Sequence, residues 1–300
     1  MDGIINVYKE AGFTSHDVVA KLRGILHQKK IGHTGTLDPA ATGVLPVCCG
    51  KATKVCELLT DKDKSYRAIC RLGIETDTQD TTGNILKQYD ISGINEEDIR
   101  KCVMEFQGDI MQVPPMYSAL KVNGKKLYEL AREGKVIERE ARPVCIKSID
   151  IVNIDFDNGV FTMDVTCSKG TYIRTLCHDI GKKLGIAAAM ESLERSRVSI
   201  FEIENAMTLS QIQQMVDEDM DAFEEKVIKV DSLFDYPKLH VNKSGAKYLS
   251  NGNSLKKDNF IDSEKTVIKD GQSVLVYDEC GCFKAIYALK GREYKVVKMF

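Results

Sequence analysis

The segment from Gly32 to Gly43 constrains the fold most, because it places three glycines in a polar stretch that leads directly into an apolar one. Glycine adopts backbone angles that side chains disfavour, so we expect a tight loop that another backbone approaches closely. The apolar run Val44–Cys48 that follows predicts a buried strand. Pro39 fixes its own φ and biases Asp38 towards an extended conformation. The sequence therefore predicts a tight loop that presents one carboxylate.

An Asp-Pro pair alone most often starts a turn, in which the aspartate oxygen accepts a hydrogen bond from a nearby backbone N–H. Here other motifs surround the pair. The loop and the residues after it match the pattern GHTGTLDPxATGVLP, and four further motifs follow a fixed order: Lys9–Ser15, Lys64–Ala68, Gln112–Gly134 and Cys167–Arg174. Five ordered motifs rarely arise by chance, and together they make the chain resemble the TruB-type tRNA pseudouridine-55 synthases.

The resemblance implies a fold class and a domain organisation. We expect an α+β fold with a mixed, largely antiparallel sheet core, flanking helices and a thumb insertion. The catalytic domain is expected over residues 1–235, with the thumb at about 111–142. Residues 236–300 are expected to form a small C-terminal RNA-binding β domain of the PUA-like kind.

The resemblance also implies roles for individual residues. Asp38 matches the catalytic aspartate, and Arg174 is its natural partner for a charge-assisted pair. Tyr66 matches a residue that packs against the target base and is the candidate to relay the proton from C5 of the uracil. Tyr172 and Leu193 match positions that line the uracil pocket. Without the motifs, Tyr66 and Leu193 would be interpreted as core residues and Arg174 as a helix-surface arginine.

The expected activity is isomerisation of the uridine at position 55, in the T-loop of tRNA, to pseudouridine. The N1–C1′ bond breaks, the uracil rotates, and C5 joins the sugar, so the resemblance implies no cofactor and no metal. The Asp38 carboxylate can attack covalently or remove a sugar proton on a path through a glycal, and the sequence leaves both paths open. The uridine must be extruded from its stack, and the ring of His33 is expected to occupy the vacated space.

The distribution of charge suggests where RNA binds. The net charge is −2, but eight basic residues face four acidic ones between Lys121 and Lys147. We expect Lys121, Lys125 and Lys126 to contact phosphates of the tRNA T-arm. A second basic group, residues 21–30, precedes the Asp38 loop, whereas residues 217–221 form an acidic run that is expected to be a solvated surface.

Cysteine spacing and hydropathy bear on the setting in which the protein works. The ten cysteines include no Cys-x-x-Cys pair, so zinc-ribbon spacing is missing. Free cysteines with apolar neighbours are typical of a reducing compartment, and no apolar run approaches the length of a membrane span. We therefore expect a cytoplasmic enzyme. We also expect a monomer that works without an obligate protein partner.

Local patterns predict the main elements. Thr14 is expected to cap a helix to about Leu26, with Asp17 completing the capping box, and Asn95 to cap a helix to about Phe106. Asn158-Gly159 predicts a hairpin. Further predicted strands are 4–8, 65–72, 151–156, 160–167, 273–277 and 294–297; further predicted helices are 54–59, 171–184 and about 210–228. Residues 76–83 are expected to be a loop, and Tyr236-Pro237 a domain boundary.

Two alternative functions remain open. A guide-RNA-dependent pseudouridine synthase of the dyskerin kind shares the LDP loop, although the intact thumb motif at Tyr117–Lys121 favours a stand-alone enzyme. A noncatalytic tRNA-folding chaperone could use the same binding surface. The joint presence of Asp38, Tyr66 and Arg174 favours catalysis.

Overall fold

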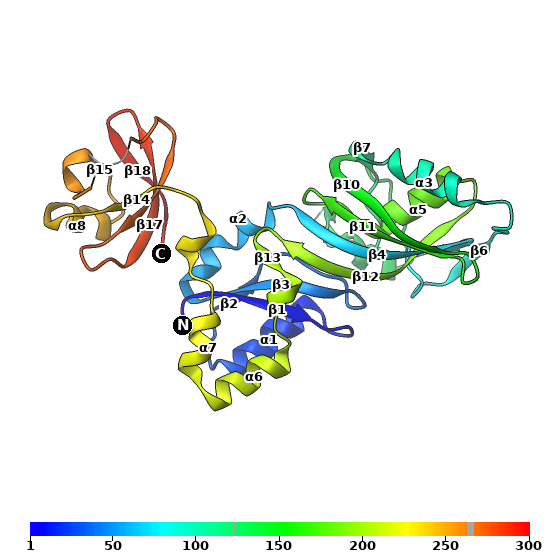
Figure 1. Cartoon of the computed structure of the whole chain (residues 1–300), viewed down its shortest axis with the longest axis horizontal. Coiled ribbons are helices and arrows are strands. Elements are labelled where there is room, and N and C mark those ends of the chain that lie inside the picture. Colours follow the sequence, from blue (N-terminus) through cyan, green and yellow to red (C-terminus); the bar gives the residue numbers. More distant parts are fainter. Residues whose placement is uncertain (123, 263–266) are drawn as a thin grey trace.

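A computed structural model describes residues 1–122, 124–262 and 267–300. The chain forms a long mixed sheet with helices packed on it, followed by a smaller β-sheet unit that contains the C-terminus (Figure 1). This arrangement confirms the predicted fold class. In the part of the chain that the structure describes, we find no helix that is long and apolar enough to cross a membrane.

The larger sheet has the strand order β1-β3-β12-β4-β11-β10-β7, with β2 paired to β3 and β13 paired to β12. Its strands are β1 (Gly3–Lys9), β2 (Ile31–His33), β3 (Thr42–Cys49), β4 (Lys64–Leu72), β7 (Gly108–Gln112), β10 (Arg142–Asp155), β11 (Val160–Cys167), β12 (Ala188–Val198) and β13 (Phe201–Glu202). β3 and β12 pair in parallel, and the other neighbours pair antiparallel. The predicted hairpin at Asn158-Gly159 joins β10 to β11.

Strand β12 lies in the middle of this sheet, between β3 and β4, but the sequence patterns did not predict it. Four of its residues, Glu191, Glu194, Arg195 and Arg197, are charged, and charged residues hide the alternation that marks a half-buried strand. Pairing with two neighbouring strands therefore decides this element, rather than local propensity.

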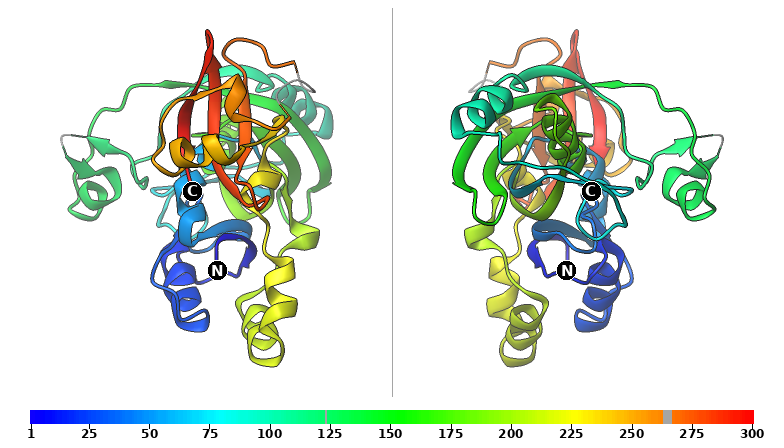
Figure 2. Two further views of the ribbon diagram at one scale, coloured as in Figure 1. Left: turned by 90° about the vertical axis from the view of Figure 1, so that its left-hand side faces the viewer. Right: turned by 90° about the vertical axis from the view of Figure 1, so that its right-hand side faces the viewer.

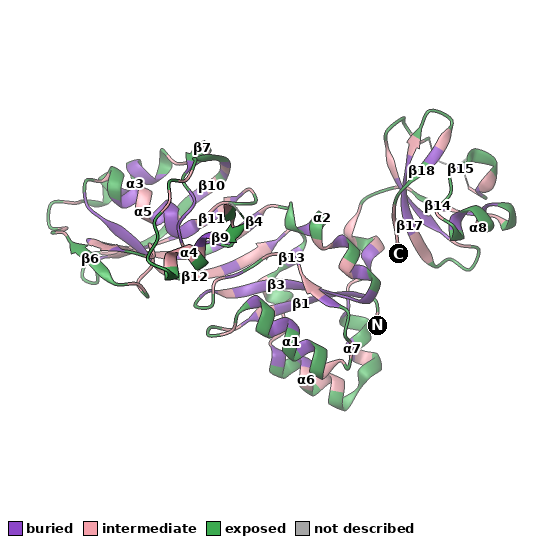
Figure 3. Cartoon of the chain, turned by 180° about the vertical axis from the view of Figure 1, so that it is seen from behind, coloured by how far each residue is buried: buried purple, intermediate pink, exposed green. Residues whose placement is uncertain are grey.

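The predicted helix caps are present. Thr14 caps α1 (Ser15–Ile25) through a capping box with Asp17, and Asn95 caps α3 (Glu96–Met104) in the same way. Helix α5 (Ile173–Lys183) packs with α3 against β4, β10 and β11, while α1 packs against β1 and β3. Figure 3 shows buried residues along the strands and exposed residues on the outward faces of the helices.

The prediction of one helix over about 210–228 was wrong. The structure has two helices, α6 (Leu209–Glu218) and α7 (Met220–Lys226), separated at Asp219. The backbone of Asp219 is extended, and its carboxylate accepts hydrogen bonds from the N–H groups of Asp221 and Ala222 at 3.0 Å. Aspartate competes for backbone donors in this way and favours a helix start over a helix interior.

The C-terminal unit has a sheet of order β14-β16-β17-β18-β15 around its own core. Its strands are β14 (Lys238–His240), β15 (Leu255–Lys256), β16 (Ser273–Tyr277), β17 (Phe283–Lys290) and β18 (Glu293–Met299), so the strands predicted here are confirmed. The sequence patterns missed helix α8 (Lys243–Ser250), which Asn242 caps.

Residues at the chain end hold this unit against the rest of the molecule. Phe300 packs, with Phe283, on the cluster that contains Val55 and Leu59. These two core residues belong to the 3₁₀ turn η1 (Gly50–Val55) and helix α2 (Cys56–Thr60), close to the predicted helix 54–59. Lys298 Nζ also donates to the Lys54 carbonyl at 2.8 Å, while Lys54 Nζ donates to the Met299 carbonyl at 2.8 Å.

Two short hairpins extend from the main sheet. One pairs β5 (Ile74–Thr76) with β6 (Ile85–Gln88) around the predicted loop 76–83. The other pairs β8 (Lys121–Val122) with β9 (Lys125–Lys126) and continues into α4 (Leu127–Arg132). Figure 2 shows the segment around α4 projecting from one side of the molecule, within the region that the sequence assigns to a thumb.

Candidate active site

Buried neighbours hold the loop that carries Asp38 in place. Leu37 and Ala41 are 3% and 2% exposed and belong to the same core cluster as Tyr66. The Leu37 N–H donates to Ser15 Oγ on α1 at 2.9 Å. Asp38 is therefore fixed between two anchored residues while its own side chain remains 38% exposed.

Gly43 allows this loop to enter the sheet. It has φ +102°, and a Cβ built on it would lie 2.3 Å from the backbone oxygen of Arg195, which is opposite Gly43 in the parallel pair. At Gly32 the nearest atom to such a Cβ, Cys56 Sγ, is 3.6 Å away, which is ordinary contact. The predicted close approach of another backbone therefore occurs at Gly43.

Arg174 pairs with Asp38 through a hydrogen bond from Nη2 to Oδ2 at 2.5 Å. The arginine side chain is 8% exposed and lies in the first turn of α5, where the helix dipole disfavours a cation. A carboxylate partner offsets this cost. Among the residues that the structure describes, none donates a hydrogen bond to the other oxygen of Asp38, Oδ1.

A second carboxylate, Asp80, lies on the other side of the arginine, with Oδ2 at 3.8 Å from Arg174 Nη1. The loop that holds Asp80 is tied to β12, because Thr81 N–H donates to the Met190 carbonyl at 2.9 Å. Asp80 Oδ1 accepts from Thr78 Oγ1 at 2.8 Å. Sequence patterns did not indicate Asp80, because a polar loop of this composition has no motif that separates a structural aspartate from one in a site.

Tyr66 lies on β4 and is 8% exposed, within the cluster that contains Leu37. Burial raises the pKa of its hydroxyl, and the adjacent positive charge of Arg195 acts in the opposite direction. The charge of Asp38 also affects the pKa of Tyr66, raising it. The predicted catalytic side chains Asp38, Tyr66 and Arg174 are thus gathered in one place.

His33 is the last residue of β2, and its ring packs edge-on against His16 of α1 at 5.3 Å between centroids. The Gly35 N–H donates to His33 Nδ1 at 3.3 Å. Burial, and after it the proximity of His16, lowers the pKa of His33, so the ring is neutral at pH 7. A neutral, held ring at the entrance of the Asp38 loop is compatible with the predicted stacking role.

The predicted helical stretch 171–184 included Tyr172, but in the structure Tyr172 is the N-cap residue of α5 and lies one residue before the helix. Gln112 lies at the end of β7, is 2% exposed, and forms two hydrogen bonds with the backbone of Tyr172. The Tyr172 N–H donates to Gln112 Oε1 at 2.8 Å, and Gln112 Nε2 donates to the Tyr172 carbonyl at 3.1 Å. Burial raises the pKa of the Tyr172 hydroxyl. Tyr172 therefore connects α5 to the start of the thumb.

Leu193 lies on β12 opposite Ala68 of β4. It is half-buried and packs against the cluster that contains Tyr66. The position is compatible with a pocket wall, because the side chain is not fully enclosed by the core.

The three thumb lysines are separate from these residues and lie on the β8–β9 hairpin. Lys121 and Lys125 are exposed, and Lys125 lies 3.6 Å from Glu133. Lys126 Nζ donates to the Tyr128 hydroxyl at 3.1 Å. The structure leaves these cations at the surface, where phosphates can reach them.

Three buried cations surround the Asp38 loop: Lys9, Lys64 and Arg195, which are 0%, 8% and 1% exposed. Lys9 Nζ donates to the carbonyl of Pro39 at 3.2 Å and to that of Phe13 at 2.7 Å. Burial lowers the pKa values of Lys9 and Lys64 to about 8 each. Local sequence patterns predicted no role for these side chains, because such patterns do not show that a charge is buried.

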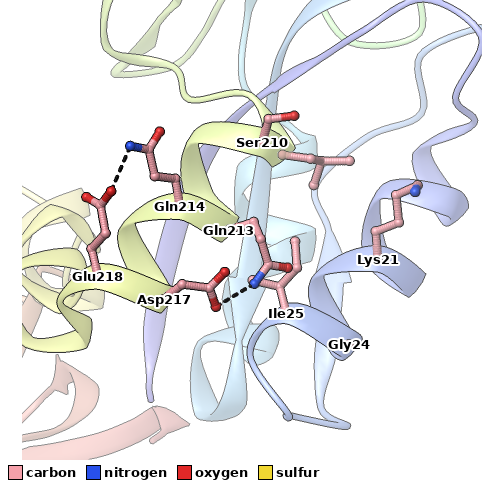
Figure 4. A pocket seen from close by; sticks show the side chains of 9 residues that line it. Lys21, Gly24, Ile25, Ser210, Gln213, Gln214, Asp217 and Glu218 are labelled. Atoms are coloured by element: carbon pink, nitrogen blue, oxygen red, sulfur yellow. Dashed lines mark hydrogen bonds between the residues drawn. The ribbon is translucent and has the colours of Figure 1, made fainter.

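A groove of about 800 Å³ lies elsewhere, between α1 and α6 (Figure 4). Lys21 and Ile25 line one wall, and Gln213, Asp217 and Glu218 line the other. The acidic run 217–221 thus begins opposite one member of the basic group 21–30. None of the predicted site residues lines this groove, so we do not assign catalysis to it.

The ten cysteines are all free thiols. Among the described residues, no three His, Cys, Asp or Glu side chains are grouped so that they could hold a metal ion.

Family models and known proteins show similarity over the whole site. Residues 23–173 match the N-terminal domain of the TruB family pseudouridylate synthases, and residues 174–235 match the C-terminal domain of tRNA pseudouridylate synthase B. A curated relative from Lachnoclostridium phytofermentans, named tRNA pseudouridine synthase B, is 50% identical over 310 residues, with 100% of both chains covered. A protein of the same name from Clostridium perfringens is 43% identical, covering 100% of this chain and 99% of the relative.

Solved structures show the same fold at lower identity. The chain is similar to one in a Cbf5-Nop10-Gar1 complex, with TM-score 0.73, 28% identity and coverage of 99% of this chain and 84% of the other. An H/ACA RNP bound to a substrate RNA that contains 2′-deoxyuridine gives TM-score 0.72 at 26% identity, with the same coverage. The two family models together span the Asp38 loop, Tyr66 and Arg174, and the curated relatives match from end to end. The chain therefore belongs to the TruB family of pseudouridylate synthases.

Proposed function

We propose that the protein isomerises the uridine at position 55 in the T-loop of tRNA to pseudouridine, with Asp38 as the catalytic carboxylate. The observation that carries this proposal is the 2.5 Å pair between Asp38 and Arg174, beside Tyr66. Full-length relatives named tRNA pseudouridine synthase B, at 43% and 50% identity, support the tRNA substrate.

Arg174 holds Asp38 by one oxygen, through a charge-assisted hydrogen bond. An ionised carboxylate can attack C1′ of the ribose, or it can remove a sugar proton on the path through a glycal. Both paths need a carboxylate that the substrate can reach. The 38% exposure of Asp38, beside an arginine that is 8% exposed, meets this need.

Tyr66 is proposed to act after the uracil has rotated. When C5 has bonded to C1′, it still carries its hydrogen, and a base must remove that proton to restore the ring. Tyr66 lies in the same cluster as Leu37, the residue next to Asp38. Asp38 acts on the ribose, and Tyr66 acts at C5 of the uracil.

The remaining residues are proposed to bind RNA. The target uridine must leave its stack, which costs a few kcal/mol, and the held ring of His33 fills the vacated space. Tyr172 and Leu193 line the pocket for the uracil. Lys121, Lys125 and Lys126 bind phosphates of the T-arm, on a thumb that Tyr172 connects to the site through Gln112. We further propose a monomer that works in the cytoplasm without an obligate protein partner.

The test uses the purified full chain and an unmodified tRNA transcript labelled with tritium at C5 of uridine. Pseudouridine formation releases the C5 tritium, and chemical mapping then locates the product. We expect one modified position, in the T-loop, without added RNA or protein, and no release with the Asp38→Asn variant. Absence of release by the wild-type chain would overturn the proposal.

The same experiment separates the two alternative functions. A guide-dependent enzyme would need an added guide RNA and partner proteins before tritium is released. The similarity to chains in Cbf5 and H/ACA assemblies is a reason to test this, although the identity is only 26–28%. A noncatalytic chaperone would accelerate tRNA refolding and release no tritium under any of these conditions.

A further inference from the structure

Arg195 is a buried arginine that forms no ion pair with any acidic side chain among the residues that the structure describes. Its side chain is among the largest fully buried ones, at 1% exposure. Within residues 1–122, 124–262 and 267–300, its hydrogen bonds go to backbone oxygens: Nε to Val44 at 2.7 Å, Nη1 to Thr36 at 3.4 Å and Nη2 to Gly35 at 3.5 Å. A buried charge without a counter-ion costs several kcal/mol, so its retention calls for a reason.

The side chain that faces this cation is Tyr66. The two residues lie opposite each other in the register of β12 and β4. Burial lowers the pKa of Arg195, and the charge of the neighbouring Tyr66 phenolate opposes that effect. In return, the guanidinium opposes the rise in the pKa of Tyr66 that burial causes. The two groups are therefore electrostatic partners when the phenol loses its proton.

Removal of the proton from C5 of the uracil requires a Tyr66 hydroxyl that has lost its own proton. In the intermediate, C5 carries both the ribose and a hydrogen, and N1 is doubly bonded to C6. When a phenolate takes the C5 proton, the C–H electron pair forms the C5–C6 double bond, and the N1–C6 π pair moves to N1, which takes up a proton. The phenolate must exist beforehand, in a site from which water is largely excluded.

We propose that Arg195 is a positioning residue of this reaction: its buried guanidinium, opposite Tyr66 in the sheet, stabilises the Tyr66 phenolate that accepts the C5 proton. The inference rests on the proposed function. The strong bond to Val44 fixes the guanidinium in the sheet, so its charge is preorganised and need not move during the reaction.

A structural role is the competing explanation, since Arg195 also bonds the loop before Asp38. Those two bonds are long, at 3.4 and 3.5 Å, whereas the bond to Val44 is short. A support for the loop would affect the reaction through Asp38, whatever residue stands at position 66. An electrostatic partner of Tyr66 would lose its effect when the hydroxyl is removed. The two explanations therefore predict different results in a double-mutant cycle.

The experiment measures the single-turnover rate of C5 tritium release at saturating tRNA for wild type, Arg195→Met, Tyr66→Phe and the double variant. We expect Arg195→Met to slow the wild-type chain about 100-fold, the size of losing one preorganised donor. In the Tyr66→Phe background the same change should slow the reaction less than about threefold, because coupled sites are not additive. Circular dichroism and tRNA affinity report whether each variant folds.

A pH series adds a readout that a structural role would not move. Charged and titratable groups around the pair are Asp38 and Cys167 next to Tyr66, and Lys9, His33 and Lys64 next to Arg195. The rise of the rate with pH should move to higher pH in Arg195→Met by about one unit or more, because the phenolate loses its counter-charge. Arg195→Lys, which keeps a cation, should retain most of the wild-type profile and serves if the methionine variant does not fold.

Arg197→Met is the matched control. Arg197 lies on the same strand and bonds Ser65 Oγ at 2.9 Å and the Ser199 carbonyl at 3.2 Å. Its loss should change the rate little in either background. Equal slowing by the Arg195 change with and without the Tyr66 hydroxyl would overturn the inference alone. If the wild-type chain releases no tritium, the proposed function fails and the inference fails with it.

Discussion

Arg174 Nη2 and Asp38 Oδ2 lie 2.5 Å apart although 136 positions separate the two residues in the chain. One belongs to the first turn of a buried helix, and the other to a loop beside β3. The pair therefore exists only when the helix has packed on the sheet. Its arginine is enclosed and its carboxylate is accessible, an arrangement that suits a reactive carboxylate held in place better than a surface ion pair.

Replacing Asp38 by Asn is expected to abolish turnover and leave tRNA binding nearly intact. Asparagine keeps the shape but is a much weaker nucleophile and base, while binding depends on many contacts elsewhere. The measurement is the single-turnover rate beside the dissociation constant for tRNA. A variant that retained more than about a hundredth of the wild-type rate, a barrier difference of ~2.7 kcal/mol, would remove Asp38 from the reaction.

Arg174 should matter more than Asp80 for the chemical step. Arg174 bonds Asp38 directly, whereas Asp80 lies 3.8 Å from the arginine and acts only through it. We expect Arg174→Met to lower the saturated single-turnover rate by about 100-fold and Asp80→Asn by about tenfold, the cost of a charge-assisted bond and of a weaker contact. The reverse order would show that the 3.8 Å contact, rather than the 2.5 Å bond, holds the site.

The thumb lysines should set the salt dependence of tRNA binding. Each lysine that neutralises a phosphate releases counterions, so affinity falls as salt rises. Replacing Lys121, Lys125 and Lys126 together by Gln is expected to flatten the slope of log affinity against log salt. Asp38→Asn is the control and should keep the wild-type slope. An unchanged slope in the triple variant would exclude these lysines from the interface.

Residues 239–300 are expected to add binding and no chemistry. The predicted site residues all lie before them, and the contacts of this unit with the rest of the chain include those of Phe300 and Lys298 with η1 and α2 and the bond from the Tyr277 hydroxyl to Asp231. A chain that ends at residue 238 should need more tRNA for half-maximal rate and keep its saturated rate. Loss of saturated chemistry in a truncation that remains folded would show that this unit shapes the active site.

The free energy of unfolding should decrease at acidic pH, because His33 is buried in the folded state. Burial holds the pKa of His33 below its usual value of 6.5, so the folded state binds fewer protons than the unfolded state below that pH. The free energy of unfolding is therefore expected to fall as pH drops from about 6.5 through the folded-state pKa. Well above pH 6.5, His33 is neutral in both states and adds no pH dependence. Urea unfolding at several pH values checks this. His33→Phe should reduce the loss, and an identical pH dependence in both proteins would contradict the assignment.

Local sequence determined the elements whose signals are short-range. The capping boxes at Thr14 and Asn95 and the Asn158-Gly159 hairpin follow from side-chain and backbone chemistry within four residues, and the structure confirms them. The alternation that buries Tyr66 and exposes Arg67 is equally local. The ordered motifs fixed the family and the fold class as well.

Tertiary structure alone decided the elements and charges that depend on distant partners. Strand β12 carries four charged residues and becomes a central strand because β3 and β4 pair with it on both sides. Asp80 joins the site because its loop bonds β12, and Arg195 becomes a buried cation because that strand turns it towards Val44 and Tyr66. The free energy of such contacts comes from desolvation and from neighbours far along the chain, which no local pattern contains.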